Sequence, residues 1–100
     1  MRRTLYLALA LSSIATCAYA ADPIKIGMSQ PLTGDIAASG TYVANGAKVA
    51  VDVVNRSGGV LGRQIRLILE DNKSNPKEAV ATAEKLLSGD KVPVILGAWG

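Results

Sequence analysis

The order in which two kinds of apolar segment alternate is the strongest constraint on how this chain folds. Three short β-favouring runs, residues 24–28, 64–69 and 92–96, are separated by two stretches whose apolar residues recur with a helical period. A connection of helical length between strands favours parallel pairing and a right-handed crossover. The sequence therefore predicts a βαβαβ unit, and we assign the fold class as α/β with a doubly wound parallel sheet.

Both helical stretches have a predicted inner face and recognisable ends. The first face comprises Val43, Ala47, Ala50, Val51 and Val54. That stretch ends at Ser57-Gly58-Gly59, because glycine adopts the left-handed conformation that stops a helix. The second face comprises Ala79, Val80, Ala83, Leu86 and Leu87. Before it, Asn75 is expected as the N-cap, Pro76 as a first-turn proline and Glu78 as the acid of a capping box, with Gly89 at the end.

Residues 1–20 have the pattern of a secretory signal peptide. Arg2-Arg3 precedes a short apolar stretch, and Ala18-Tyr19-Ala20 matches the small-x-small motif that predicts cleavage between Ala20 and Ala21. The apolar stretch is shorter than the roughly 20 residues that span a bilayer, so we do not expect the mature chain to cross the membrane. Two alternatives stay open: a buried core helix, and lipid anchoring at Cys17, which Thr16 disfavours because a small residue usually precedes the modified cysteine.

Charge and composition exclude several function classes. The chain carries 11 basic and 8 acidic residues, but removal of residues 1–20 takes Arg2 and Arg3 with it and leaves nine against eight, a net charge of +1. We therefore expect no nucleic-acid partner. The absence of histidine and the presence of only one cysteine argue against a metal site, and no cofactor is expected.

No catalytic set of residues is recognisable in the sequence. The glycine-rich segment 58–62 follows a helix and precedes a strand, the reverse of a phosphate-binding loop, so we interpret it as a turn. Glu70 and Asp71 would suit a general acid and base, but adjacent strand residues point to opposite faces, which favours loop-capping or solvated carboxylates. We expect no enzymatic activity.

The carboxyl edge of the predicted sheet is where a ligand is expected, because open parallel sheets bind ligands outside the carboxyl ends of their strands. Two segments occupy such ends: residues 29–40, a connection of about twelve residues, and residues 98–100. If the first strand lies between the second and the third, these two segments flank one crevice.

Motifs that carry a family resemblance occur in order along the chain. They are Ile24-Lys25-Ile26-Gly27, Pro31-Leu32-Thr33-Gly34, Ser39-Gly40, Gly46-Ala47 with Asn55, Gly58-Gly59-Val60-Leu61-Gly62, Leu69-Glu70-Asp71-Asn72 with Asn75-Pro76, and Val94-Ile95-Leu96-Gly97. Across residues 23–100 this set resembles the start of the Leu/Ile/Val-binding protein family, the periplasmic substrate-binding components of branched-chain amino-acid ABC transporters. No single motif is specific, but the ordered set is.

The resemblance implies a two-lobed type I periplasmic binding protein. Residues 21–100 would then form the N-terminal part of its first lobe, so we expect the start of a longer protein. The family binds a small molecule in the cleft between its lobes, and the closed form docks on a membrane permease. Periplasmic localisation after export is the corresponding expectation. A receptor's ligand-sensing domain, or a sensor of amides, urea or aromatic acids, has the same fold and remains an alternative function.

The resemblance carries over to only a few ligand contacts. An aromatic residue often precedes the loop glycine in this family, and here that position is Ser39. The groups that clasp a ligand carboxylate begin just after the third strand, which places Trp99 and Gly100 at the edge of the pocket. Trp99 either lines the pocket or packs beneath the interface between the lobes. Gln30 and Thr33 either reach the ligand from the first loop or stabilise that loop by hydrogen bonds. The departure at Ser39 opens the pocket to ligands other than leucine-type amino acids, such as short amides or aromatic acids.

Overall fold

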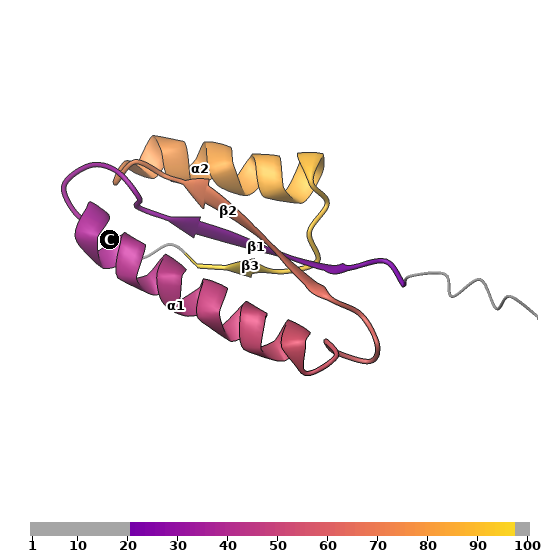
Figure 1. The fold of residues 1–100 in the computed structure, drawn as a ribbon. Coiled ribbons are helices and arrows are strands. Elements are labelled where there is room, and N and C mark those ends of the chain that lie inside the picture. Colours follow the sequence, from indigo (N-terminus) through magenta and orange to yellow (C-terminus); the bar gives the residue numbers. More distant parts are fainter. Residues whose placement is uncertain (1–20, 98–100) are drawn as a thin grey trace, which may run out of the picture.

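A computed structural model describes residues 21–97, which form a three-stranded sheet with a helix on each face (Figure 1). In chain order the elements are β1 (Ile24–Gln30), α1 (Ala37–Arg56), β2 (Ile65–Asp71), α2 (Pro76–Glu84), a π-helical turn η1 (Lys85–Gly89) and β3 (Ile95–Leu96). The predictions for residues 1–20, Trp99 and Gly100 lie outside the described residues. Within residues 21–97, no helix is both long and apolar enough to span a membrane.

The sheet is parallel and has the order β2-β1-β3. β1 pairs with β2 along its whole length, from Ile24 opposite Ile65 to Gln30 opposite Asp71. α1 and α2 cover opposite faces of the sheet (Figure 1). This arrangement confirms the predicted doubly wound βαβαβ order and the place of the first strand between the other two.

The strand boundaries differ from those expected. β1 and β2 each run two residues beyond their apolar runs, because polar residues at their carboxyl ends stay in register. β3 contains only Ile95 and Leu96 of the predicted run 92–96. Val92 is buried and its N–H donates to the carbonyl oxygen of Leu86, so it belongs to the end of the preceding helical turn. Pro93 then separates that turn from the strand, since proline has no N–H to donate to a ladder.

The first turn of α1 packs closely against the loop that leaves β1. A Cβ atom added to Gly40 would lie 1.9 Å from the carbonyl oxygen of Pro31, and Ala44 is almost fully buried one turn later. Val43, expected on the inner face, is 38% exposed, so the predicted face was wrong at that position. The helix ends as expected, because Gly58 and Gly59 both adopt positive φ.

The far half of α1 and the sheet leave an apolar cavity of about 220 Å³ between them. Its lining comprises Ile26, Ala47, Ala50, Val51, Val54, Ile65, Leu67 and Leu96. Four of these residues come from the predicted inner face of α1, which confirms that they face the cavity, although Ala50 remains exposed within it.

α2 begins as expected but is rotated relative to its predicted face. The side chain of Asn75 accepts hydrogen bonds from the N–H groups of Lys77 and Glu78, which confirms the N-cap. The capping box is not completed: the N–H of Asn75 donates to the carbonyl oxygen of Asn72, and the Glu78 carboxylate lies 3.8 Å from Nζ of Lys73.

Val80 and Leu87, both expected on the inner face of the second helix, are 60% and 55% exposed. The buried positions are Thr82 and Leu86. Thr82 turns inward because its hydroxyl is 2.8 Å from that of Ser29 in β1, so its polar atom is satisfied.

Candidate ligand-binding edge of the sheet

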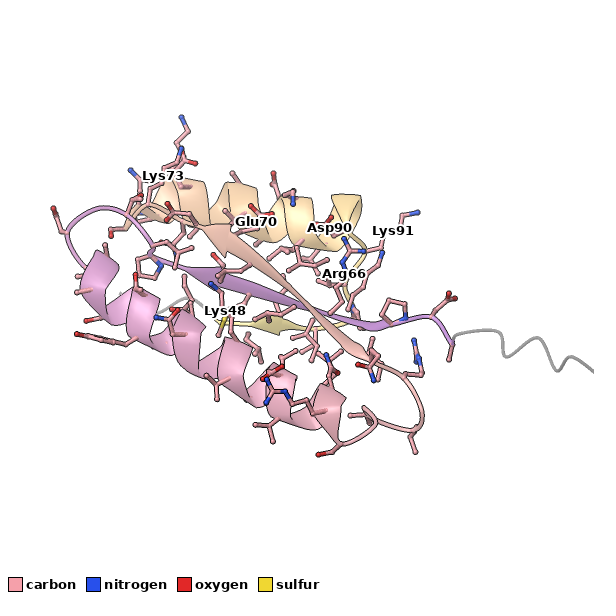
Figure 2. All side chains as sticks on the ribbon, viewed as in Figure 1. Lys48, Arg66, Glu70, Lys73, Asp90 and Lys91 are labelled. Carbon is pink, nitrogen blue, oxygen red and sulfur yellow. The ribbon has the colours of Figure 1, made fainter. Side chains whose placement is uncertain are left out.

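The connections that leave the carboxyl ends of the strands lie at one edge of the parallel sheet. The connection from β1 to α1 comprises only residues 31–36, because Ser29 and Gln30 complete the strand and residues 37–40 already form the helix. The expectation of an unusually long loop was therefore wrong. Figure 2 shows Lys73 at this edge and Lys91 near the opposite end of the sheet.

Asp71, the last residue of β2, binds the loop that leaves β1. Its Oδ1 accepts hydrogen bonds from the N–H groups of Leu32 (2.9 Å), Thr33 (3.2 Å) and Lys73 (2.8 Å). Its Oδ2 accepts one from the hydroxyl of Thr33 at 2.7 Å. Burial raises the pKa of Asp71, but the Thr33 hydroxyl and the three backbone N–H groups outweigh that effect and hold the pKa below its ordinary value of 3.8. The carboxylate is therefore ionised at neutral pH and acts as a loop brace.

Ser74 joins the same two loops a second time. Its hydroxyl donates to the carbonyl oxygen of Thr33 at 2.8 Å and accepts from the N–H of Ile36 at 3.3 Å. Lys73 and Ser74 both have a φ of 55°, a left-handed conformation that is unfavourable for residues with a side chain. Gly34 faces them with a φ of 91°, and a Cβ atom there would lie 2.7 Å from Oγ of Ser74. We call residues 31–36 and 71–74 the paired loops.

Glu70 has a separate role from its neighbour. Its carboxylate pairs with the ammonium group of Lys85, which also lies 3.0 Å from the carboxylate of Asp90. Hydrogen bonds to Glu70 and to Asp90 raise the pKa of Lys85. Glu70 and Asp71 thus have different partners, which supports the loop-capping interpretation of Asp71 over an acid–base pair.

Gln30 joins the carboxyl end of β1 to that of β3. Its side chain is 2% exposed, and Nε2 donates to the carbonyl oxygen of Gly97 at 2.7 Å. Oε1 is buried and has no hydrogen-bond partner within the described part of the chain. The structure thus brings the exit of the third strand beside the exit of the first, as the predicted crevice requires.

The remaining predicted contacts occupy different environments. Ser39 is half-buried in the first turn of α1, and Thr33 is exposed with its hydroxyl bound to Asp71. For Gln30 and Thr33 the geometry matches the loop-stabilising alternative. The bracing by Asp71 and Ser74 was not anticipated in detail, although their place just after the apolar run 64–69 was the available signal. Within residues 21–97 no group of three or more potential metal-ligating side chains occurs.

Comparison with known proteins identifies the family of this chain. The family described as periplasmic binding protein matches residues 23–100. This chain belongs to the periplasmic binding protein family. The resemblance inferred from the ordered motifs is therefore confirmed, as is the fold class.

Two relatives of this periplasmic binding protein have names that state what they bind. The Leu/Ile/Val-binding protein BraC3 of Rhizobium johnstonii is 41% identical over 87 residues, which cover 87% of this chain and 23% of the relative. The leucine-, isoleucine-, valine-, threonine-, and alanine-binding protein of Pseudomonas aeruginosa is 38% identical over 93 residues, which cover 93% of this chain and 25% of the relative. The chain thus spans about a quarter of the length of these relatives.

Two solved structures are similar to the fold described above. The branched-chain amino acid transporter substrate-binding protein LivJ of Streptococcus pneumoniae, in complex with isoleucine, has a TM-score of 0.73 and 40% identity, covering 75% of this chain and 22% of that one. A solute-binding protein of an ABC transporter from Rhodopseudomonas palustris, in complex with 3,4-dihydroxybenzoic acid, has a TM-score of 0.64 and 31% identity, covering 74% and 20%.

Proposed function

We propose that this chain begins a periplasmic substrate-binding protein of an ABC transporter. It captures a branched-chain amino acid, or a similar small carboxylate or amide, in a cleft between two lobes. The observation that carries the proposal is the juxtaposition at the carboxyl edge. Gln30 holds Gly97 beside the paired loops, so the exits of β1 and β3 form one wall. The names of the relatives support the class of ligand.

The mechanism is capture without chemical change. The Thr33 hydroxyl and Nε2 of Gln30 already have protein partners, so we assign both residues to building the wall. Ser39, Trp99 and Gly100 are the proposed ligand contacts of this lobe. A ligand that binds the closed arrangement of the lobes more tightly than the open one shifts the population toward closure, and the closed form docks on the permease.

Thermal-shift measurements on the complete polypeptide test the proposed function. The panel comprises L-leucine, L-isoleucine, L-valine, L-threonine, L-alanine, acetamide and 3,4-dihydroxybenzoic acid. A ligand that binds only the folded state at about 100 times its Kd stabilises the protein by about 2.7 kcal/mol, which is readily seen as a higher Tm. If no member of the panel raises the Tm at millimolar concentration, the proposal is wrong.

Substitution of Ser39 then tests the location of the pocket. Ser39→Ala should weaken binding of the most stabilising panel member several-fold. The same change at Ser57, whose hydroxyl donates to the carbonyl oxygen of Val53 at the opposite end of α1, should leave the Kd unchanged. Equal effects of the two variants would contradict a pocket at the carboxyl edge.

The N-terminus of the mature protein tests the proposed export route. Intact mass and N-terminal sequencing of protein from a periplasmic extract should show a chain that starts at Ala21 and carries no lipid. A chain that starts at Cys17 with an attached diacylglycerol would instead establish the lipoprotein alternative.

A further inference from the structure

We propose that Gln30 is a positioning residue for ligand binding: its side-chain amide holds Gly97, at the exit of β3, at a set place beside the paired loops. This inference rests on the proposed function, because it assigns to Gln30 a share of the affinity of the same cleft. Gln30 acts through Gly97 and does not itself contact the ligand.

The first step of the argument is the short pairing between β1 and β3. Among residues 21–97, two backbone positions of these strands are in register, Gly27 opposite Ile95 and Met28 opposite Leu96. Beyond Leu96 the contact with β1 continues through a side chain, since Nε2 of Gln30 donates to the carbonyl oxygen of Gly97 at 2.7 Å. The place of Gly97 relative to β1 therefore depends on this amide.

The second step is the way that Gln30 connects both neighbours of β1. Its backbone is opposite Asp71 in β2, and its carbonyl oxygen accepts the N–H of Asn72 at 3.0 Å. One residue thus ties the exit of β2 through its main chain and the exit of β3 through its side chain. Gln30 therefore contacts both neighbours of β1 at the candidate cleft wall, alongside the bonds that Asp71 and Ser74 make between the paired loops.

The third step is the cost of a glutamine at this position. The side chain is buried and its Oε1 has no partner among residues 21–97. An unsatisfied buried acceptor destabilises a fold, whereas an apolar side chain of the same length would fill the space without that penalty. Packing therefore does not favour glutamine here, and the hydrogen bond to Gly97 is what an apolar residue cannot supply.

Two substitutions remove the hydrogen bond while keeping the length of the side chain. Gln30→Met has no donor, and Gln30→Glu has a carboxylate that cannot donate to a carbonyl oxygen when ionised. Asn55 provides a matched control at the opposite edge of the sheet. Its Nδ2 donates to the carbonyl oxygen of Ile65 at 2.9 Å, and its Oδ1 accepts the N–H of Ile65 at 2.7 Å. Asn55→Leu therefore removes a comparable side-chain brace that is remote from the cleft.

The experiment measures Kd by isothermal titration calorimetry and Tm without ligand, both on the complete polypeptide. The probe is the panel member that raises the wild-type Tm most. We expect Gln30→Met and Gln30→Glu to raise the Kd at least tenfold, and Asn55→Leu to change it less than twofold while lowering the Tm. A purely structural role for Gln30 would lower the Tm and leave the Kd unchanged.

The outcomes separate this inference from the proposed function. If wild-type protein binds no member of the panel, both are overturned. If the wild type binds, two results overturn only the role of Gln30. In the first, the Kd values of Gln30→Met and Gln30→Glu lie within twofold of the wild-type Kd. In the second, Asn55→Leu weakens binding as much as the Gln30 variants do. If the variants do not fold, NMR of the wild-type protein tests the hydrogen bond directly. One Nε2 proton of Gln30 should exchange slowly with solvent, and rapid exchange of both protons would overturn the inference.

Discussion

Replacing Gly40 by alanine tests how closely α1 is seated against the loop that leaves β1. The added Cβ atom would lie 1.9 Å from the carbonyl oxygen of Pro31, whereas real Cβ atoms essentially never approach closer than 3.0 Å. The helix and the loop would have to separate by at least the difference, 1.1 Å. The obstructing atom belongs to the backbone, and the next two residues of the loop donate their N–H groups to Asp71, so it cannot simply rotate away.

The expected cost follows from two opposing effects. Overpacking a tight contact costs about 1–3 kcal/mol, and the rigid neighbour places Gly40→Ala near the upper end. Alanine returns about 1 kcal/mol through its higher helix propensity. We therefore expect a net loss of about 2 kcal/mol in the free energy of unfolding, equivalent to a Tm lower by about 4–8 °C for a unit of 150–250 residues.

Gly46 in the same helix is the matched control. A Cβ atom there meets nothing within 4 Å, so Gly46→Ala should raise stability by about 0.5–1 kcal/mol. Urea unfolding of the complete polypeptide, followed by circular dichroism, measures both variants. If Gly40→Ala is as stable as wild type, or if the two variants change stability in the same direction, the close seating of α1 is refuted.

Three further substitutions test polar contacts. Burial raises the pKa of Asp71, but its hydrogen bonds lower the pKa more. The ionised carboxylate therefore stabilises the fold at neutral pH, and this contribution is lost as the pH falls below 3.8. Urea unfolding of Asp71→Asn should thus depend less on pH between about pH 6 and about pH 2.5 than that of wild type, and parallel curves would contradict the brace. Thr82→Val should cost about 1–2 kcal/mol because it leaves the buried hydroxyl of Ser29 without its 2.8 Å partner. Ser29→Ala should then destabilise the Thr82→Val variant less than it destabilises the wild type. Equal destabilisation of both would argue against a hydrogen bond between the two hydroxyls. Lys85→Met removes an ammonium group whose pKa is raised above 10.5 by hydrogen bonds to Glu70 and to a second carboxylate. The stabilisation of the fold by this ammonium group is present below pH 10.5 and is lost as the pH rises through the pKa in the folded state. Wild type should therefore lose stability in alkali relative to this variant, and identical alkaline unfolding curves would count against the ion pair.

The order of the elements could be predicted because it depends on local physics. Period-2 and period-3.6 patterns lie within single segments, and the glycines after α1 stop that helix wherever it packs. The predicted turn at residues 58–62 is confirmed for the same reason. Leu61 and Gly62 have φ values of 51° and 75°, and Val60 and Arg63 exchange two backbone hydrogen bonds.

Leu86 was correctly expected on the inner face of the second helical stretch and is fully buried, but the burial of Thr82 could not be predicted from that stretch's own sequence. Thr82 is polar, and only its partner Ser29, 53 residues earlier, makes its burial favourable. Val80 and Leu87 matched an apolar face by composition but are exposed, because the contact with β1 determines the rotation of the helix. A π-helical turn at residues 85–89 changes the register once more.

The sequence predicted where the candidate site lies in the fold but not which side chains contact one another there. The sequence located the carboxyl edge and pointed to Gln30 and Thr33, leaving open whether they touch a ligand or stabilise the loop. The hydrogen bonds that these two side chains make span 67 residues for Gln30 to Gly97 and 38 for Thr33 to Asp71. Such long-range side-chain contacts have no local sequence signature.

The central place of β1 has a consequence for the order of assembly. The first strand synthesised has both edges open until residues 65–71 and 95–96 follow, with separations of 41 residues for Ile24 and Ile65 and 68 for Gly27 and Ile95. Contacts this distant in the chain require large loops to close before they stabilise anything, which slows folding. β1 therefore keeps an unpaired edge until residues 95–96 have been synthesised, and factors that shield such edges from aggregation should bind the chain at Ile24–Gln30 during that interval.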